Sequence, residues 1–313
     1  MIDMTGAELA ACIGIDFRAL QLSSTALAEQ LHTLGEVRTR TTAGAAFIEQ
    51  LGSFPCSEDV SEAGLVIGED GLDLRLNLRA WFWIGMRHDP RHEQFSLTVF
   101  DRQCRCLLTL TSTSGSQLSA WVALYAQSKV ALPQFDDRNT FAPREMQAPG
   151  LLQDWAAMAN VHDHFALLKR HGLSRYEANQ LVAAQFSRQL ELRSCTALFE
   201  LLAASGLELM LFIYSAGSVQ IFTGVLVDMQ RIEGALVFNM PATELAAPTL
   251  FSITDASATE VWQVRKPNEQ GGVTSLELFD DEQRLIVQVF ARRPAGQPEQ
   301  SAWREWLEAL ESH

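Results

Sequence analysis

Three histidines stand close together in the segment MANVHDHFALLKRHGLSR, which covers residues 158–175. They are His162, His164 and His171. Imidazole is a common ligand of metal ions, so the cluster raises the question of a metal site. In a helix, which advances about 100° per residue, His162 points about 200° from His164 and about 180° from His171. These side chains therefore cannot share one ion, and the spacing indicates at most one ligand.

The element that must position these histidines is an amphipathic helix, expected over residues 151–170. Its apolar stripe comprises Trp155, Met158, Val161, Phe165 and Leu168. His162 lies at the edge of this stripe, where a histidine is more often structural than a ligand, and both interpretations stay open at this point. The segment is expected to break at Gly172, and a second helix to begin at Ser174, with Glu177 completing a capping box.

The composition is that of a globular protein without membrane spans. The 313 residues suggest two domains or one large one, since domains average roughly 150 residues. Hydrophobic residues make up 47% of the chain and charged residues 20%, which is enough for a real core. No apolar run approaches the roughly 20 residues of a membrane helix. The start MIDMTGAELAAC lacks the basic region of a secretory signal. We therefore expect a cytoplasmic protein with no stable membrane association.

The formal net charge of -14 argues against nucleic acid as a partner. The lysines among the 24 basic residues are Lys129, Lys169 and Lys266, so anion sites are expected to use mostly arginine. The five cysteines, an odd number, argue against a disulfide framework: Cys12, Cys56, Cys104, Cys106 and Cys195. Cys104 and Cys106 form C-x-C in an expected strand. A zinc site is one interpretation of that pair, and small core residues are the favoured one.

The sequence contains a diverged duplication. FSLTVFD (95–101) is followed by RCLLTLTST and SAWVALYAQ, and TSLELFD (274–280) is followed by RLIVQVF and SAWREWLEAL. Both runs read as strand, turn at Phe-Asp, strand, and a helix beginning near Ser-Ala-Trp. We predict an N-terminal half over residues 1–131, a proline-containing linker over 132–150, and a C-terminal half over 151–313 that carries the histidine helix.

Strand patterns set the fold class. GLDLRLNLRAW (71–81) alternates apolar and polar residues, and LMLFIY and VQIFTGVLV read as two strands joined by a tight turn at residues 215–217. Strand runs with helices grouped before and after them indicate an α+β fold with antiparallel sheets, not alternating βαβ units. Glycine-rich phosphate loops, G-x-S-x-G and H-E-x-x-H are absent from the sequence.

Three segments resemble one known family. They are VWQVRKPNEQGGVTSLELFDDEQRLIVQVFARRPAGQPEQSAWREWLEAL, DWAAMANVHDHFALLKRHGLSR and GLDLRLNLRAW. The sequence is similar to the bacterial hemin-degrading factors, also called cytoplasmic hemin transport proteins of HemS type. The resemblance covers most of the chain and is strongest over 154–182 and 261–307. It implies two similar halves, each a large antiparallel sheet with helices packed on it, and a cleft between the halves that holds one b-type heme.

The resemblance also implies roles for individual residues. It makes His162 the axial ligand of the heme iron and leaves His164 and His171 as bystanders. The other implied heme contacts are Arg75, Arg175, Lys266, Gln288, Phe290 and Arg293. Arg75 would lie on the distal side of the iron, contributed by the other half, and would be the residue to act on bound oxygen if the protein is an enzyme. Arginine suits the heme propionates, because its planar fork binds carboxylates bidentately.

Four departures from the family pattern stand out. Phe290 replaces the usual tyrosine, so one hydroxyl of the pocket is missing. Ser215-Ala216-Gly217 stands where the family has Asn-Arg-Gly, which removes an arginine. Ile48 occupies the position of a histidine that some members use as a second heme contact, so we predict one heme site. The segment 240–256 is longer than expected.

These residues leave carrier and enzyme both open. As a carrier, the protein would bind incoming heme through His162 and hand it to a separate heme oxygenase, with an inner-membrane heme transporter as a second partner. As an enzyme, it would open the porphyrin ring with electrons from an external donor, because the sequence carries no flavin, nicotinamide or iron–sulfur motif. That absence and the missing hydroxyl at Phe290 favour the carrier. A diverged scaffold that no longer binds heme is a third hypothesis.

Overall fold

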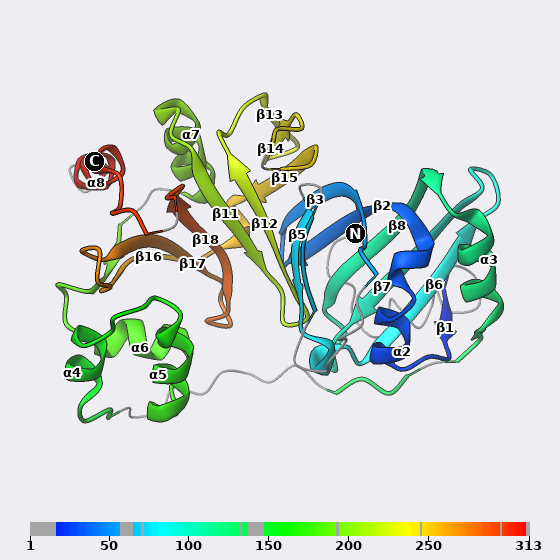
Figure 1. Cartoon of the computed structure of the whole chain (residues 1–313), viewed down its shortest axis with the longest axis horizontal. Helices are drawn as coiled ribbons and strands as arrows, with labels where there is room; N and C mark the ends of the chain where they lie inside the picture. Colours follow the sequence, from blue (N-terminus) through cyan, green and yellow to red (C-terminus); the bar gives the residue numbers. More distant parts are fainter. Residues whose placement is uncertain are drawn as a thin grey trace. The chain divides into compact units, whose positions relative to one another are not determined.

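The computed structural model describes residues 17–56, 65–69, 72–131, 133–136, 147–191, 194–244, 246–294 and 296–310 (Figure 1). Cys12 and most of the predicted linker lie outside these residues. The chain divides into two compact units. Unit 1 comprises Met1–Asn139, Ile213–Phe222 and Val237–Ser252, and unit 2 comprises Thr140–Phe212, Thr223–Leu236 and Ile253–His313. The predicted division of the chain into two repeated halves joined by a linker at residues 132–150 stays a prediction.

The described residues form two large sheets. In hydrogen-bonded order, the first consists of β13 (Met229–Ile232), β14 (Ala235–Met240), β15 (Thr249–Thr254), β3 (Ala46–Ser53), β2 (Gly35–Ala43), β8 (Cys106–Ser116), β7 (Gln94–Phe100), β6 (Trp83–Asp89), β1 (Arg18–Leu20) and β9 (Ser128–Lys129). The second consists of β10 (Ser187–Leu190), β16 (Glu260–Lys266), β17 (Val273–Phe279), β18 (Leu285–Ala291), β11 (Leu209–Tyr214), β12 (Ser218–Gly224), β5 (Leu72–Leu76) and β4 (Leu65–Glu69). Neighbouring strands such as β7 and β8, or β16 and β17, run antiparallel. The predicted α+β class with antiparallel sheets is confirmed.

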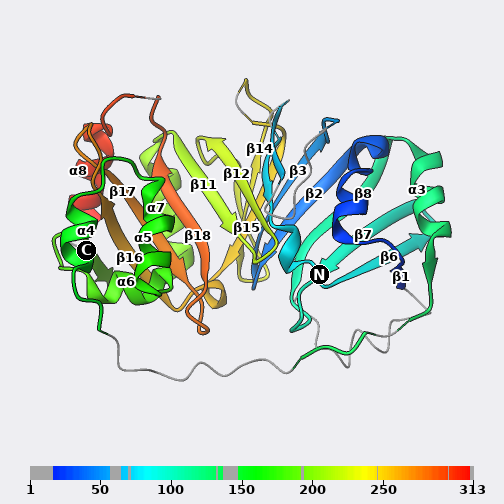
Figure 2. The ribbon, with the colours of Figure 1, turned by 60° about the horizontal axis from the view of Figure 1, so that its bottom comes forward.

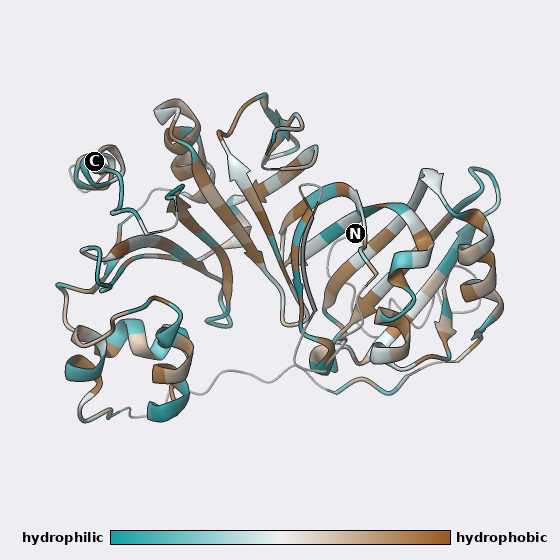
Figure 3. Cartoon of the chain, in the orientation of Figure 1, coloured by the Kyte–Doolittle hydropathy of each residue, from teal (hydrophilic) through white to brown (hydrophobic). Residues whose placement is uncertain are grey.

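Unit 1 has one large apolar core, which its strands form together with its helices. The helices α2 (Ser24–Ala28) and α3 (Leu118–Ala126) pack there, with the short 3-10 helices Leu31–Leu34 and Leu78–Ala80. Leu72, Leu74 and Leu76 are buried and Arg75 between them is exposed, so the predicted alternation is confirmed. Figure 3 shows hydrophobic residues running along the strands, as burial of one sheet face requires.

The turn between β11 and β12 belongs to unit 1 and packs closely within it. The Gly217 carbonyl accepts hydrogen bonds from the Trp81 indole at 3.0 Å and from the Asn77 amide at 3.0 Å. A Cβ atom at Gly217 would lie 2.6 Å from Leu107 Cδ1. Only glycine therefore fits this turn, which the sequence predicted between the two strands.

Unit 2 places helices on both faces of its strands. The helices α4 (Leu151–Ala156), α5 (Asp163–His171) and α6 (Arg175–Leu181) form one group beside β16 and β17 (Figures 1 and 2). Their apolar side chains pack on Trp262, Val264 and Phe279. The C-terminal helix α8 (Ser301–Leu310) lies on the other side of these strands (Figure 1), where the Trp303 indole donates to the Thr274 carbonyl at 3.0 Å. The remaining helices are α7 (Cys195–Ser205) and the 3-10 helix Asp255–Ser257.

The duplication is visible in a turn that occurs once in each unit. In the second copy, Asp280 joins β17 to β18, and its Oδ1 accepts backbone hydrogen bonds from residues 282 and 284 at 3.0 and 2.9 Å. The Arg284 Nη2 lies 2.7 Å from the Asp280 Oδ2. In the first copy, Asp101 makes the same backbone bonds to residues 103 and 105 at 2.9 and 2.8 Å. The predicted repeat thus extends to the hydrogen bonds of its turn.

The turn also corrects one expectation. Cys104 and Gln283 hold the same left-handed position, each with φ of 61°. Cys104 therefore lies in the turn and not in a strand, whereas Cys106 begins β8. The cause is the Asp101 carboxylate, which accepts hydrogen bonds from the amides of residues 103 and 105 and so holds them in the turn. Both thiols are buried in an aromatic cluster with Phe17, Trp83 and Phe100.

Loss of the Asp280 carboxylate is expected to destabilise the fold. Asp280→Ala removes two accepted backbone bonds and an ion pair at a buried site, so the free energy of unfolding should fall by about 2–3 kcal/mol. Urea unfolding measures this, with the neighbouring exposed Asp281→Ala as the control. Equal stability of the two variants would contradict the structural role of the turn.

Candidate functional site

The helix predicted over residues 151–170 is two helices, and this changes the position of His162. α4 ends at Ala156 and α5 begins at Asp163. Between them, Asn160 Oδ1 accepts a hydrogen bond from the His162 amide at 3.0 Å, and the Asn160 carbonyl accepts one from the Asp163 amide at 3.0 Å. An asparagine that bonds the backbone locally competes with the helix, which explains the break. His162 is therefore the exposed N-cap residue of α5.

The three histidines have three different environments. His162 is exposed, and Phe165, predicted for the apolar stripe, is instead 77% exposed on α5. His164 is only 3% exposed, and its ring meets Trp155 edge-on at 4.9 Å. The His171 Nε2 lies 2.9 Å from Asp154 Oδ2, so it ties α5 to α4. Among the residues that the structure describes, no group of three His, Cys, Asp or Glu could hold a metal ion.

A buried carboxylate, Glu277 of β17, binds two of the predicted basic residues of unit 2, Lys266 and Arg175. Its Oε1 accepts hydrogen bonds from Lys266 Nζ at 2.6 Å, Gln288 Nε2 at 2.7 Å and Arg175 Nη1 at 3.1 Å. Its Oε2 accepts one from Asn179 Nδ2 at 2.9 Å. The donors come from β16, β18 and α6, so one carboxylate joins three neighbouring elements to β17.

The charges of this Glu277 cluster determine its protonation. Burial would raise the pKa of Glu277, but Lys266 and Arg175 lower it well below its usual value, so the carboxylate stays ionised. Burial lowers the pKa of Lys266 to about 8, even though Glu277 favours the charged amine. Burial and the same two cations lower the pKa of His164 to about 2, so its ring is neutral. One anion therefore faces two cations in a buried site.

The predicted heme contacts are not equally accessible. Arg175 keeps 26% of its side chain exposed, whereas Lys266 and Gln288 are buried against Glu277. Phe290 is half-buried and meets Phe212 edge-on at 5.5 Å. Arg293 is half-buried, and its Nη1 donates to the Gln297 carbonyl at 2.7 Å. These positions leave the heme-binding roles as predictions.

Two further predicted positions lie in unit 1. Arg75 is exposed on β5, where it stands opposite Val219 of β12. Its place on the distal side of the iron stays a prediction. Ile48, at the position of the histidine found in some members, is fully buried in β3. An aliphatic side chain has no lone pair for iron, so this position cannot supply a second ligand.

Sequence reasoning missed Glu277 and Asn179. The signal for Glu277 was present in TSLELF, because a single charged residue on an otherwise uncharged, buried strand requires a buried partner. Its partners were harder to find. Gln288 stands opposite Glu277 in the register of β17 and β18, but Lys266, Arg175 and Asn179 approach from other elements.

The fold and these residues define a class: a duplicated α+β protein of two large antiparallel sheets, with an exposed imidazole and several arginines available for a ligand. A sequence model for the family described as "Haemin-degrading HemS.ChuX domain" matches residues 5–128 and again residues 172–310. The chain therefore belongs to this family, and the resemblance drawn from its motifs is confirmed.

Individual relatives agree with this membership. The chain is 34% identical to the hemin transport protein HmuS of Yersinia pestis, over 95% of this chain and 87% of the relative. It is 33% identical to the hemin transport protein HemS of Yersinia enterocolitica, over 94% and 86%. The solved structures of the heme degrading enzyme ChuS of Escherichia coli O157:H7 and of holo-PhuS, a heme-binding protein from Pseudomonas aeruginosa, each match with a TM-score of 0.81 and 30% identity. Each match covers 97% of this chain, and the matches cover 90% of the ChuS chain and 89% of the PhuS chain.

Neutralising Glu277 is expected to destabilise the protein strongly. Glu277→Gln leaves Lys266 and Arg175 buried or half-buried without their anion, which typically costs about 3–5 kcal/mol of unfolding free energy. Because the folded-state pKa of Glu277 lies below its ordinary value of 4.5, the stabilisation is complete above that pH and is lost as the pH falls. The difference between wild type and variant should therefore shrink in acid.

Urea unfolding at several pH values measures both effects. Glu269→Gln, an exposed carboxylate in unit 2, is the matched control and should behave like wild type. If Glu277→Gln also unfolds like wild type at pH 7, Glu277 does not hold the cluster together.

Proposed function

We propose that this protein is a cytoplasmic heme-binding protein of heme uptake and iron utilisation. In this proposal it binds one heme b through His162 and passes it to a separate degrading enzyme. Relatives at 34% and 33% identity are named hemin transport proteins, and a structure that matches over 97% of the chain is a heme-binding protein. The described helices include none long and apolar enough to cross a membrane. The observation that carries the proposal is the exposed imidazole of His162 at the start of α5.

The residues around His162 suit a heme. Iron of a b-type heme accepts a neutral imidazole nitrogen and is the centre for any redox chemistry. Because His162 is the exposed N-cap residue of α5, its ring can project from the end of the helix without packing against the following helical turns. Phe165, three residues later, exposes 77% of its surface, and a large apolar side chain is stabilised when a macrocycle covers it.

The propionates require cations, and we assign them mainly to Arg175. Its guanidinium is partly exposed and shares the Glu277 Oε1 with Lys266 and Gln288. Glu277 keeps its other donors when Arg175 turns toward a ligand, so the exchange of one carboxylate for another costs little. Lys266 and Gln288 are then supporting residues, because Lys266 balances the charge of Glu277 and the neutral Gln288 amide donates a hydrogen bond to it. Arg293, Phe290 and Arg75 complete the proposed contacts.

A heme-degrading enzyme is the alternative function. It is favoured by the 30% identity to a structure described as a heme degrading enzyme. In this case Arg75 would donate hydrogen bonds on the distal side of the heme, and electrons would come from an external donor. Phe290 cannot hold or move a proton there, because it has no hydroxyl. We therefore retain the carrier as the first proposal.

Removal of the His162 imidazole is expected to abolish specific heme ligation. Hemin added to the wild-type protein should give a sharpened Soret band that saturates at one equivalent, because the iron gains a nitrogen ligand. With His162→Ala the band should stay broad and the affinity should fall at least tenfold. His171→Gln, which alters the contact with Asp154 but not the proposed ligand, is the control. An unaltered spectrum in His162→Ala would refute the proposal.

The stability of the bound heme separates carrier from enzyme. The heme-loaded protein is mixed with ascorbate and catalase, and the Soret band is followed over time. A carrier should keep the band, because catalase removes the peroxide that destroys heme non-specifically. Decay that persists with catalase, and that slows in Arg75→Gln, would instead establish the degrading enzyme.

A further inference from the structure

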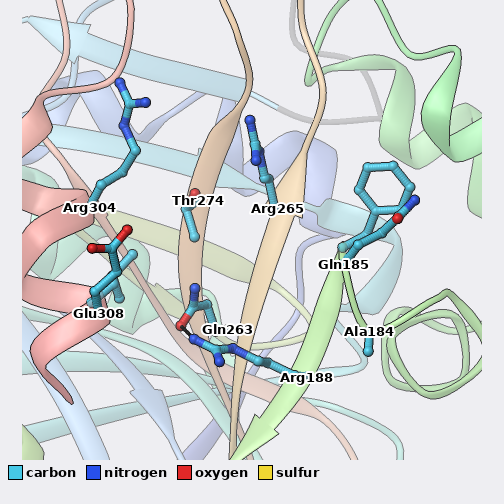
Figure 4. A pocket seen from close by; sticks show the side chains of 10 residues that line it. Ala184, Gln185, Arg188, Gln263, Arg265, Thr274, Arg304 and Glu308 are labelled. Carbon is cyan, nitrogen blue, oxygen red and sulfur yellow. Dashed lines mark hydrogen bonds between the residues drawn. The ribbon is translucent and has the colours of Figure 1, made fainter. Parts of the chain in front are cut away.

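A second polar site lies in unit 2, on the opposite face of β16 and β17 from the Glu277 cluster. It is a cavity of about 260 Å³ between the edge strand β10, the strands β16 and β17, and the helix α8 (Figure 4). Successive strand residues point to opposite faces, so Arg265 faces this cavity while the next residue, Lys266, faces Glu277. Thr274 of β17 also lines the cavity, whereas Glu277 lies on the other face. The two sites are therefore separate.

Three guanidinium groups from three elements surround this cavity. They belong to Arg188 of β10, Arg265 of β16 and Arg304 of α8 (Figure 4). Burial lowers the pKa of Arg188, which reflects a site partly withdrawn from water. In a chain with a net charge of -14, three arginines that line one cavity make a local exception. Such a concave positive surface attracts small anions.

Each of the three arginines donates a hydrogen bond to a neutral acceptor. Arg188 Nη2 donates to Gln263 Oε1 at 2.8 Å, Arg265 Nη2 to the Gly271 carbonyl at 2.9 Å, and Arg304 Nη2 to the Glu299 carbonyl at 3.0 Å. Gly271 and Gly272 both have positive φ, 98° and 96°, which brings this turn against Arg265. Hydrogen bonds to amide and carbonyl oxygens fix a guanidinium without neutralising its charge.

Two carboxylates, Glu308 and Glu299, lie near the arginines and offset part of their charge. Glu308 lines the cavity, so three cations face one anion there. The Glu299 carboxylate is buried and accepts from the Thr274 amide and hydroxyl at 2.5 and 3.1 Å. Its Oε2 lies 3.8 Å from Arg304 Nε, and burial raises its pKa. Three arginines and these two carboxylates leave a formal excess of positive charge at the cavity.

We propose that this cavity is a binding site for a small oxyanion with two or more negative charges, carried on a phosphoryl group or on several carboxylates. Planar guanidinium forks bind both kinds of oxyanion bidentately. The volume of about 260 Å³ lies below the roughly 300–1,000 Å³ typical of drug-sized ligands, so the site suits one compact anion. In this proposal Arg265 and Arg304 provide its main contacts, and Arg188 also lines the cavity. This site does not depend on the proposed heme function.

Calorimetric titration of the full chain tests the site. Inorganic phosphate and citrate are the probes, each at constant ionic strength balanced with chloride. Saturable binding at one site per chain is expected for at least one probe. Phosphate alone would identify a phosphoryl ligand, citrate alone a polycarboxylate, and both a site that reads only oxyanion charge. Absence of saturable heat for both probes would overturn the proposal.

Variants separate a built site from general ionic effects. Arg304→Gln and Arg265→Gln should each weaken binding at least tenfold, while Arg304→Lys, which keeps the charge, should weaken it less. Arg231→Gln is the matched control, because Arg231 is an exposed arginine of unit 2 paired with Glu200. Equal binding by all variants, or an equal loss in Arg231→Gln, would contradict the proposal. Hemin titration of Arg304→Gln should match wild type, because its side chain lies on the other face of the sheet.

Discussion

The constraint on which unit 2 depends is the buried negative charge of Glu277. A carboxylate placed in a core is tolerated only if its oxygens are fully hydrogen-bonded and its charge is balanced. Lys266, Gln288, Arg175 and Asn179 meet that condition at 2.6–3.1 Å. Each of them is thereby fixed in position as well. Three of the residues that the family resemblance marks as heme contacts, Arg175, Lys266 and Gln288, are thus held by a residue that the resemblance does not mark.

The same region positions the histidine helix through two aromatic contacts. The Trp155 indole of α4 donates to the Arg265 carbonyl on β16 at 3.0 Å, directly before Lys266. The His164 ring then packs edge-on against Trp155 at 4.9 Å. Because His164 is buried and neutral, it acts as an apolar anchor for the first turn of α5. His162 lies two residues earlier and is exposed. The buried His164 thereby fixes the position of the helix end that carries His162.

Sequence patterns predicted what depends on periodicity and failed where one side chain overrides it. Alternation gave β5 with its buried leucines, and the repeat of Phe-Asp and Ser-Ala-Trp gave two copies of the same strand–turn–strand–helix unit. The helix over 151–170 was wrong because Asn160 bonds its own backbone, which no 3.6-residue period reveals. Cys104 was wrongly predicted in a strand, because the hydrogen bonds from nearby amides to Asp101 form only in the folded turn. Glu277 was missed because its partners meet only in three dimensions.

Strand alternation also explains how unit 2 carries two positive sites in an acidic protein. In the motif Arg-Lys-Pro, the Lys266 side chain lies on the face of β16 that holds Glu277. The Arg265 side chain lies on the opposite face and lines the cavity together with Arg188 and Arg304. A lysine suits the buried position, because a compact amine fits a single 2.6 Å bond to a carboxylate and keeps its proton there. An arginine suits the open position, because its fork keeps donors available after one bonds the Gly271 carbonyl. Exchanging these two neighbours would therefore leave both faces with the wrong cation.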